Sequence, residues 1–452
     1  MMRSTANARN SRFLLQPNRT ILYLSLPILL SLIAEPVTGL VDTGFVAQLG
    51  TTPLASLTVG TGALTSLFWI FGFLGIATQT EVAQAFGKRD LDGAVRSVSL
   101  ILTLGAFVSL ALSALLIPAA ELASRLLGAE GEVLELASEY IRLRLIGAPA
   151  VVITIVGFGA LRGVQDMKTP LWIALGINFT NILLDYALIF GWAFLPALGV
   201  GGAALASSLS QWLGACWMLG AIRRRIGLTN DIRLRDGIKL MRVGRDLFIR
   251  TGSLTLFTLV ATRVATQMGA EAGAAHQVIR QFWFFTALVL EAFATTAQSL
   301  IGYFYGSGQM RSAKRVALST TAWSLATGIL LMILMLLATP LVAESMVPDD
   351  TVAVFAAAWI VAALSQPLNA LAFITDGIHW GTSDYGFLRN AMLMATICGL
   401  LALQVVATAD PVDFTGVWLA TVLWIGIRAF WGVLRVFPGI GNSPFCTRVL
   451  TQ

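Results

Sequence analysis

Charged residues are scarce in this sequence. They make up 12% of the 452 residues, about half the fraction found in soluble domains. Cysteine and histidine are also rare, at three and two residues. No metal-ligand spacing, no His-Glu-x-x-His motif and no Gly-Lys-Ser/Thr loop is present, which argues against a metalloenzyme and against an ATP-driven pump. The net charge of +6 is too modest to indicate a nucleic-acid partner.

Hydrophobic residues, by contrast, make up 56% of the chain, and the mean hydropathy is +0.78. Apolar runs of about 20 residues recur throughout, and each can cross a bilayer as a helix. We therefore predict an all-α membrane protein with 12 transmembrane helices. The expected spans lie near 20–48, 53–86, 93–118, 132–161, 170–193, 201–222, 243–268, 273–305, 316–340, 351–380, 388–408 and 414–436.

Lysine and arginine concentrate in alternate loops, and the loops on the opposite side contain only Arg125. The positive-inside rule then predicts an even number of spans with both termini in the cytoplasm. Residues 1–19 carry no small-residue cleavage site after an apolar core, so we expect a cytoplasmic tail there and not a cleaved signal peptide. Residues 437–452 are expected to form the C-terminal cytoplasmic tail.

The two halves of the sequence resemble each other. Gly50 and Gly269 are 219 positions apart, and Asp166 and Asp384, which end similar short motifs, are 218 apart. A near-constant offset with six spans in each half predicts a parallel repeat of two six-helix lobes. The expected parts are an N-lobe at 20–222, a basic cytoplasmic linker at 223–242 and a C-lobe at 243–436.

Two acids, Asp42 and Asp185, lie inside apolar spans. Carboxylates at membrane depth cost several kcal/mol unless they are paired or hydrated, so each indicates a functional site. Both are expected roughly 10–13 Å below the outer surface, from the rise per residue of a helix. The repeat places Ala261 opposite Asp42, so ion chemistry is expected in the first lobe.

Other polar residues are expected at the same level. Asn178 and Asn181 share a helix face with Asp185, and Ser207 falls at a similar depth. Two nearby carboxylates in a low dielectric rarely both stay ionised, so at least one is expected to hold a proton near neutral pH. Pro27 and Pro36 interrupt the first span. They are either bends coupled to protonation or static kinks packed against neighbours.

Several segments resemble the multidrug and toxic compound extrusion (MATE) family, specifically its DinF-like branch. The resemblance runs from about Ile21 to Arg435 and is carried by the combination of motifs, since any single one is weak. The matching segments are residues 36–50 (Pro-Val-Thr-Gly-Leu-Val-Asp-Thr-Gly-Phe-Val-Ala-Gln-Leu-Gly), 83–87, 161–170, 181–185, 275–277 and 376–381.

This resemblance implies two lobes arranged as a V, alternating access, and export of organic substrates driven by H⁺ or Na⁺. It also implies that Asp42 and Asp185 are the ion-coupling carboxylates, with Asn181 as their hydrogen-bond partner. Ser207 stands where relatives often have threonine, and Thr38 where some have tyrosine. The Na⁺-coupled branch is expected to have an acid in span 7, and the absence of one from residues 252–269 favours protons.

Five further charged residues have two interpretations each. Glu35 is either a second carboxylate of the ion pathway or a satisfied acid at a proline kink. Glu291 is either held in an ion pair by Arg263 or Arg280, or these arginines form a basic cavity wall for anionic substrates. Asp376 is either part of an inner gate or a solvated helix end.

The arginines of span 4, Arg142 and Arg144, are expected to bind backbone carbonyls or the neighbouring Glu135 and Glu139. The sequence as a whole favours a secondary proton antiporter for drugs or organic ions, without a cofactor or metal, acting as a monomer in a bacterial inner membrane. The alternatives are a Na⁺-coupled exporter of the same family and a flippase of lipid-linked precursors. A flippase would need a strongly cationic cavity, so the positions of Arg263 and Arg280 matter.

Overall fold

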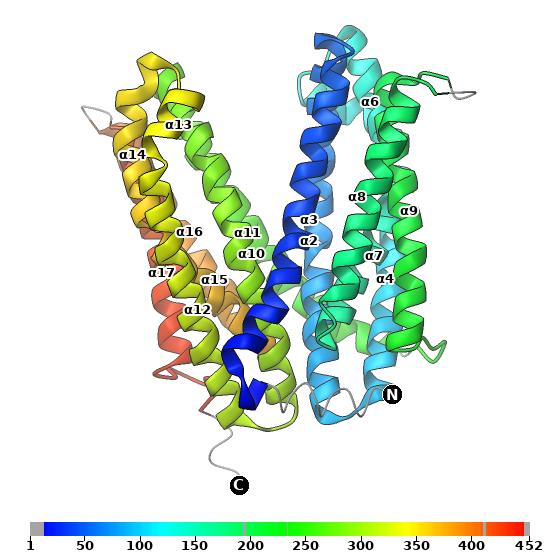
Figure 1. Cartoon of the computed structure of the whole chain (residues 1–452), viewed down its shortest axis with the longest axis vertical. Coiled ribbons are helices and arrows are strands. Elements are labelled where there is room, and N and C mark those ends of the chain that lie inside the picture. The colour runs from blue at the N-terminus through cyan, green and yellow to red at the C-terminus, as the bar shows by residue number, and fades with distance from the viewer. Residues whose placement is uncertain (1–12, 193–195, 233, 410–412, 447–452) are drawn as a thin grey trace. The chain divides into compact units, whose positions relative to one another are not determined.

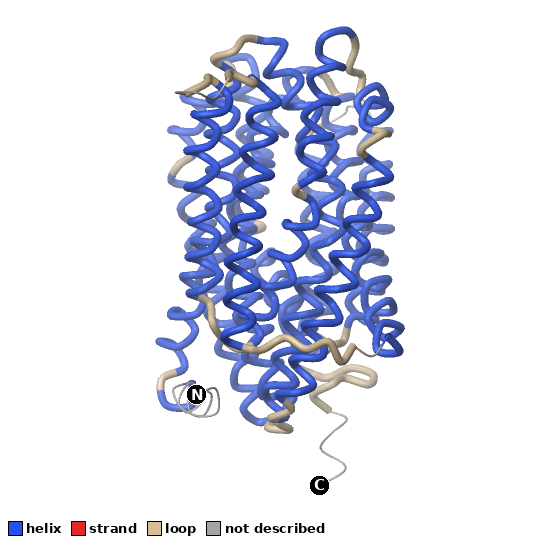
Figure 2. Tube along the Cα trace, turned by 90° about the vertical axis from the view of Figure 1, so that its right-hand side faces the viewer, coloured by secondary structure: helices blue, strands red, loops and turns tan. Residues whose placement is uncertain are grey.

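The computed structural model describes residues 13–192, 196–232, 234–409 and 413–446. The predicted tail residues 1–12 and 447–452 lie outside this part of the chain. Within it, all regular structure is helical (Figure 2). The helices of the first half are α2 (Pro17–Ala47), α3 (Thr51–Lys88), α4 (Leu91–Leu116), α5 (Ala120–Leu126), α6 (Gly131–Ile146), α7 (Ala148–Gly163), α8 (Lys168–Ile189) and α9 (Gly199–Arg225).

The second half repeats this order (Figure 1). Its helices are α10 (Leu234–Gln267), α11 (Ala270–Gly306), α12 (Met310–Leu337), α13 (Thr339–Met346), the 3₁₀ turn η1 (Asp349–Thr351), α14 (Val352–Leu364), α15 (Gln366–Gly381), α16 (Tyr385–Thr408) and α17 (Thr415–Val436).

Two of the twelve predicted spans are broken helices. The chain bends by 48° between α6 and α7 and by 45° between α14 and α15. Pro149 and Pro367 stand in the first turn of α7 and α15, where a proline is tolerated but stops the preceding helix from continuing. The predicted spans 132–161 and 351–380 are therefore each a bent pair of helices.

By length and composition, eight of the described helices are able to cross a membrane, and the two bent pairs raise this to ten. α3 and α9 occupy the predicted spans 53–86 and 201–222 but are not among these ten. Sequence reasoning thus located the helices correctly, while the total of twelve crossings stays a prediction.

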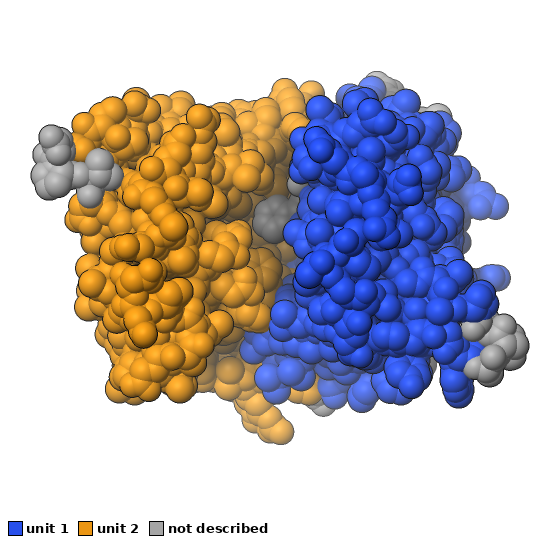
Figure 3. Space-filling view, turned by 90° about the horizontal axis from the view of Figure 1, so that it is seen from above, with its two compact units in different colours: residues 1–6, 26–241 blue, residues 7–25, 242–452 orange. Residues whose placement is uncertain are grey.

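The helices form two compact units, coloured separately in Figure 3. Unit 1 comprises residues 26–241, and unit 2 combines residues 13–25 with 242–446. The core of unit 2 contains large rings that are fully buried, including Trp359, Trp424 and Phe257. Phe257 stacks on Trp424 with ring centroids 4.6 Å apart.

Close helix crossings in both units depend on glycine. A Cβ at Gly377 of α15 would lie 2.2 Å from the carbonyl oxygen of Ala294 on α11. A Cβ at Gly159 of α7 would lie 2.3 Å from the carbonyl oxygen of Gly75 on α3. Such small residues let two backbones approach closely, which is the usual basis of helix packing in membranes.

The internal repeat is confirmed at the level of the backbone. Residues with positive φ recur at the predicted offset. The pairs are Gly50 and Gly269 (φ 115° and 123°), Arg89 and Gly308 (62° and 75°), and Gln165 and Ser383 (61° and 60°). Identical turns at equivalent positions show that the two halves share one helix–turn plan.

Helix α2 contributes to both units. Its C-terminal part, with Pro36, belongs to unit 1, whereas residues up to Ser25 belong to unit 2. Ser25 Oγ and Thr296 Oγ1 share a hydrogen bond at 2.9 Å, and the ring centroids of Phe13 and Phe304 are 5.8 Å apart. Residues 20–25 are thus part of the second unit, although the sequence prediction counted them with the first lobe.

Candidate functional site

The structure brings Asp42 of α2 and Asp185 of α8 together within unit 1. Each carboxyl group acts electrostatically on the other. Aromatic rings of the two segments also meet, because Phe45 contacts Phe190 edge to face at 6.0 Å and Tyr186 at 6.4 Å. The depth of the two acids in the membrane stays a prediction.

The pair is short of hydrogen-bond donors. Asp185 is completely buried and Asp42 is half-buried. In the described part of the chain, no donor reaches either oxygen of Asp185 or Oδ1 of Asp42. A buried carboxylate that accepts no hydrogen bond is costly as a charge. The site is thus suited to holding a proton that the surrounding side chains do not supply.

Arg144 of α6 is a cation that acts electrostatically on both Asp42 and Asp185. It also acts on Tyr140, one turn earlier on α6. Its guanidinium carbon lies 5.5 Å from the centroid of the Phe68 ring, and its Nη1 is buried without a hydrogen-bond partner among the described residues.

The sequence predicts that Arg144 binds backbone carbonyls or Glu135 and Glu139. Its interaction with Asp42 and Asp185 was not predicted. The available signal was an arginine within an apolar span, one turn after a tyrosine. The direction of the Arg144 side chain could not be predicted, because α6 stops at the 48° bend. The depth and face of the α6 side chains therefore do not follow from a straight helix over the whole span.

Asn181 and Ser207 also meet in unit 1. Nδ2 of Asn181 donates to Oγ of Ser207 at 3.4 Å, and both residues are buried. Asn178, one turn before Asn181, is half-buried. The Thr38 hydroxyl donates to the carbonyl oxygen of Ala34 on its own helix at 3.0 Å. Thr38 is buried, and its hydroxyl proton is used in a hydrogen bond within α2. It is therefore not a hydrogen-bond donor to Asp42.

The remaining predicted residues of α2 differ in how exposed they are. Glu35 is exposed and Pro36 is half-buried. Pro27 is buried, and it stands two residues after the point where α2 changes from unit 2 to unit 1. Both prolines lie inside one continuous helix.

Unit 2 contains a buried charge cluster around Asp376. Its Oδ2 accepts hydrogen bonds from Nη2 of Arg250 on α10 and from Nη2 of Arg428 on α17, the latter at 2.9 Å. The side chains of all three are at most 10% exposed. Arg428 also lies over the Trp424 ring at 4.5 Å, and Arg250 over Trp380 at 5.2 Å. The interpretation of Asp376 as a solvated helix end was therefore wrong.

Glu291 interacts with an arginine other than Arg263 and Arg280. Glu291 acts electrostatically on Arg428, a residue that the sequence analysis left without a role. Arg263 is exposed. Arg280 is also exposed, and it donates to Oε1 of Gln277 from Nη2 at 2.9 Å.

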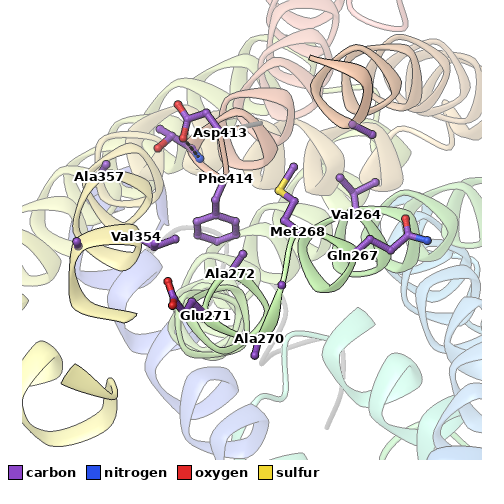
Figure 4. A pocket seen from close by; sticks show the side chains of 14 residues that line it. Val264, Gln267, Met268, Ala270, Glu271, Ala272, Val354, Ala357, Asp413 and Phe414 are labelled. Carbon is purple, nitrogen blue, oxygen red and sulfur yellow. Dashed lines mark hydrogen bonds between the residues drawn. The ribbon is translucent and has the colours of Figure 1, made fainter. Parts of the chain in front are cut away.

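A cavity of about 730 Å³ in unit 2 lies at the turn between α10 and α11 (Figure 4). Glu271 and Asp413 lie on its wall, together with Met268 and Phe414. Asp413 caps α17, because its Oδ1 accepts from the backbone nitrogen of Thr415 at 2.9 Å. Asp376, Arg250 and Arg428 are not among the residues that line this cavity.

Comparisons with known proteins agree with this arrangement. The chain is 29% identical over 430 residues to "Protein DETOXIFICATION 44, chloroplastic" of Arabidopsis thaliana, covering 92% of this chain and 81% of that one. It is 27% identical over 436 residues to "DNA damage-inducible protein F" of Escherichia coli K12, covering 94% and 90%.

The fold is that of solved structures of the same kind. "Crystal structure of MATE in the bent conformation" superposes with a TM-score of 0.84 at 22% identity, over 92% of this chain and 94% of that one. A transporter described as an "outward-facing conformation of a multidrug resistance MATE family transporter" gives a TM-score of 0.81 at 22% identity, over 92% and 95%.

The sequence model of the family described as MatE matches residues 27–187 and again residues 248–408. These two matches fall one in each half of the repeat and together cover more than half of the chain. A multi-pass helical architecture, a two-fold repeat and these matches agree. The chain belongs to the MatE (MATE) family of membrane transporters and is not an enzyme.

Proposed function

We propose that this protein is a secondary active antiporter that exports small organic substrates by alternating access in exchange for protons, with Asp42 and Asp185 carrying the proton. The observation that carries the proposal is the burial of Asp185 without any hydrogen-bond donor among the described residues, in a site where it interacts with a second acid, Asp42. The fully buried Asp185 would pay a large desolvation cost as an isolated charge. One proton shared by the pair removes the repulsion and supplies the missing donor.

Arg144 supports this role from outside the pair. A positive charge near both acids makes the proton easier to release than a pair of carboxyls in apolar surroundings alone would allow. A carrier needs both loading and release within one cycle. We propose that Arg144 favours release of the proton and that the apolar surroundings of Asp185 favour its uptake.

Sodium coupling is the alternative within the family. A Na⁺ site is built from several oxygen ligands, and the described neighbours of the pair supply an arginine instead. Asn181 donates from Nδ2 to Oγ of Ser207, which occupies one lone pair of that hydroxyl oxygen. These features favour the proton.

We place the protein in a bacterial inner membrane with both termini in the cytoplasm, on the basis of its loop charges. We also infer that it works as a monomer, since one chain holds both halves of the repeat. No cofactor is required beyond the coupling proton.

The test is transport in liposomes that contain a pH-sensitive dye. Separate H⁺ and Na⁺ gradients are imposed while ethidium, a cation, or fluorescein, an anion, is offered. Asp42→Asn and Asp185→Asn are compared with wild type and with Glu130→Gln, which neutralises an exposed loop acid. We expect substrate-dependent proton flux to be lost in both aspartate variants and kept in the control. Transport that follows Na⁺ alone, or that survives both substitutions, would overturn the assignment.

A further inference from the structure

The stretch between the two halves of the sequence accounts for the net charge of the chain. Residues 223–245 contain eight basic and two acidic residues, and their net charge of +6 equals that of all 452 residues. The positive-inside rule explains why a loop on one side of the membrane is basic. It does not explain why some of these charges share a helix face with exposed apolar side chains, as they do at the start of α10.

This face of α10 is both apolar and basic. It consists of Ile238, Met241, Arg242 and Arg245, which stand at positions i, i+3, i+4 and i+7 and so lie on the same side of the helix. Ile238 is 64% exposed and Met241 is 75% exposed. The side chain of Arg245 is 59% exposed, and Arg242 is exposed as well. We call this set of residues the α10 face.

A different side of the same helical turns packs against the protein. Leu240 contacts the apolar core of unit 1, and a Cβ at Gly237 would lie 3.4 Å from Cδ1 of Leu104 on α4. The start of α10 is therefore held by one side, and the α10 face is directed away from the residues that hold it. Two exposed large apolar side chains next to two arginines are typical of a helix that lies in a membrane interface.

The two arginines keep most of their charge for an external partner. Nη2 of Arg245 donates to Oδ1 of Asp246 at 2.8 Å, and Nη1 of Arg389 on α16 donates to the same oxygen at 2.7 Å. One carboxylate thus serves two guanidinium groups, which leaves this trio with one net positive charge. Arg242 adds a second positive charge without an ion pair among the described residues.

The length of α10 places this face at the level of the lipid headgroups. Its apolar part, Leu240–Gln267, has 28 residues, which is about 42 Å at the rise of an α-helix. This length exceeds the hydrocarbon core of about 30 Å and matches the 40–45 Å, roughly, of a bilayer with its headgroup layers. The first residues of this part, from Met241 to Arg245, therefore fall in a headgroup layer, on the side that the loop charges predict to be cytoplasmic.

We propose that the α10 face binds an anionic phospholipid of the cytoplasmic leaflet. Arg242 and Arg245 hold the phosphate, because a guanidinium matches the geometry of phosphate oxygens. Ile238 and Met241 contact the apolar part of the lipid next to its headgroup. A zwitterionic lipid fits less well, since its own ammonium group is repelled by the two arginines. The inference adds a lipid partner to the transporter and does not depend on the coupling ion.

The test is native mass spectrometry of the purified full-length protein in a neutral detergent, titrated with dioleoyl phosphatidylglycerol or dioleoyl phosphatidylcholine. Arg242→Gln combined with Arg245→Gln removes both charges of the face and leaves Asp246 paired with Arg389. Met241→Gln tests the apolar part. The matched control is Arg311→Gln with Arg315→Gln, which removes two exposed arginines near the start of α12. Melting temperatures show that all variants are folded.

We expect phosphatidylglycerol to bind more tightly than phosphatidylcholine. At about fivefold per basic residue beside an anionic headgroup, the α10 double variant should weaken phosphatidylglycerol binding roughly thirtyfold and leave phosphatidylcholine binding unchanged. Met241→Gln should weaken both lipids, and the α12 control should bind them as wild type does.

Phosphatidylglycerol affinity that is unchanged in the α10 double variant would overturn the inference. An equal loss in the α12 control would do so too, because the lipid would then respond only to total positive charge. A dimer mass in wild type that Met241→Gln converts to a monomer would assign the face to a second copy of the chain instead.

Discussion

Replacing Asp376 with asparagine is expected to destabilise unit 2 by about 3–5 kcal/mol, the cost of removing one partner of a buried ion pair. The structure sets this magnitude. One carboxylate oxygen accepts from both Arg250 and Arg428, and none of the three side chains is more than 10% exposed. Without the carboxylate, two guanidinium groups are left in the same buried site. Glu291 acts on Arg428 and offsets part of the excess charge.

Two comparison variants make the prediction specific to charge. Arg250→Met leaves the pair of Arg428 and Asp376 in place, so it should cost less than Asp376→Asn. The double variant Arg250→Met with Asp376→Asn leaves a single unpaired guanidinium. It should therefore be more stable than Asp376→Asn alone, although it carries one more substitution.

The assay is the apparent melting temperature of the purified protein in detergent, at one fixed heating rate because unfolding of such proteins is often irreversible. At roughly 2–4 °C per kcal/mol for a unit of this size, Asp376→Asn should melt roughly 6–20 °C below wild type. A shift within about 2 °C would refute the reasoning. A double variant that melts below the single one would do the same.

Three further predictions use the same melting assay. Gly377→Ala should cost about 1–3 kcal/mol by overpacking, because its Cβ would lie 2.2 Å from the Ala294 carbonyl oxygen, and an unchanged melting temperature would mean that α11 and α15 separate freely. Gly252→Ala, an exposed helical site with no atom within 4 Å, should instead stabilise by up to about 1 kcal/mol. Arg89→Gly should stabilise by about 1 kcal/mol, since Arg89 has φ 62° where the other repeat has Gly308, and a lower melting temperature would contradict this.

The interaction of Asp42 with Asp185 was expected from sequence for a physical reason. Each acid stands alone in an apolar run, and helix rise fixes its depth once the ends of the run are known. Two acids at one depth in helices of the same lobe are expected to lie near each other. The repeat was equally accessible, because Gly50 and Gly269 are required by the same turn geometry.

The partners of Asp376 and the position of Arg144 were not accessible in this way. Arg250 lies within the predicted span 243–268, but no pattern in the sequence shows that α10 buries its side chain. Arg428 meets Asp376 only through the packing of α17 on α15, for which no sequence period gives a signal. Pro149 and Pro367 were visible, but the apolar runs around them are long enough to read as single helices.

The membership of residues 13–25 in unit 2 has a consequence for how the chain is made. Ser25 binds Thr296, which is 271 positions later. At ~5–20 residues per second of synthesis, the partner of this first segment emerges tens of seconds after it. The start of α2 therefore lacks its contact with α11 until the ribosome has synthesised α11. For the same reason, the protein cannot be divided at the linker into two self-sufficient halves, since the second half would lack the segment that covers Thr296.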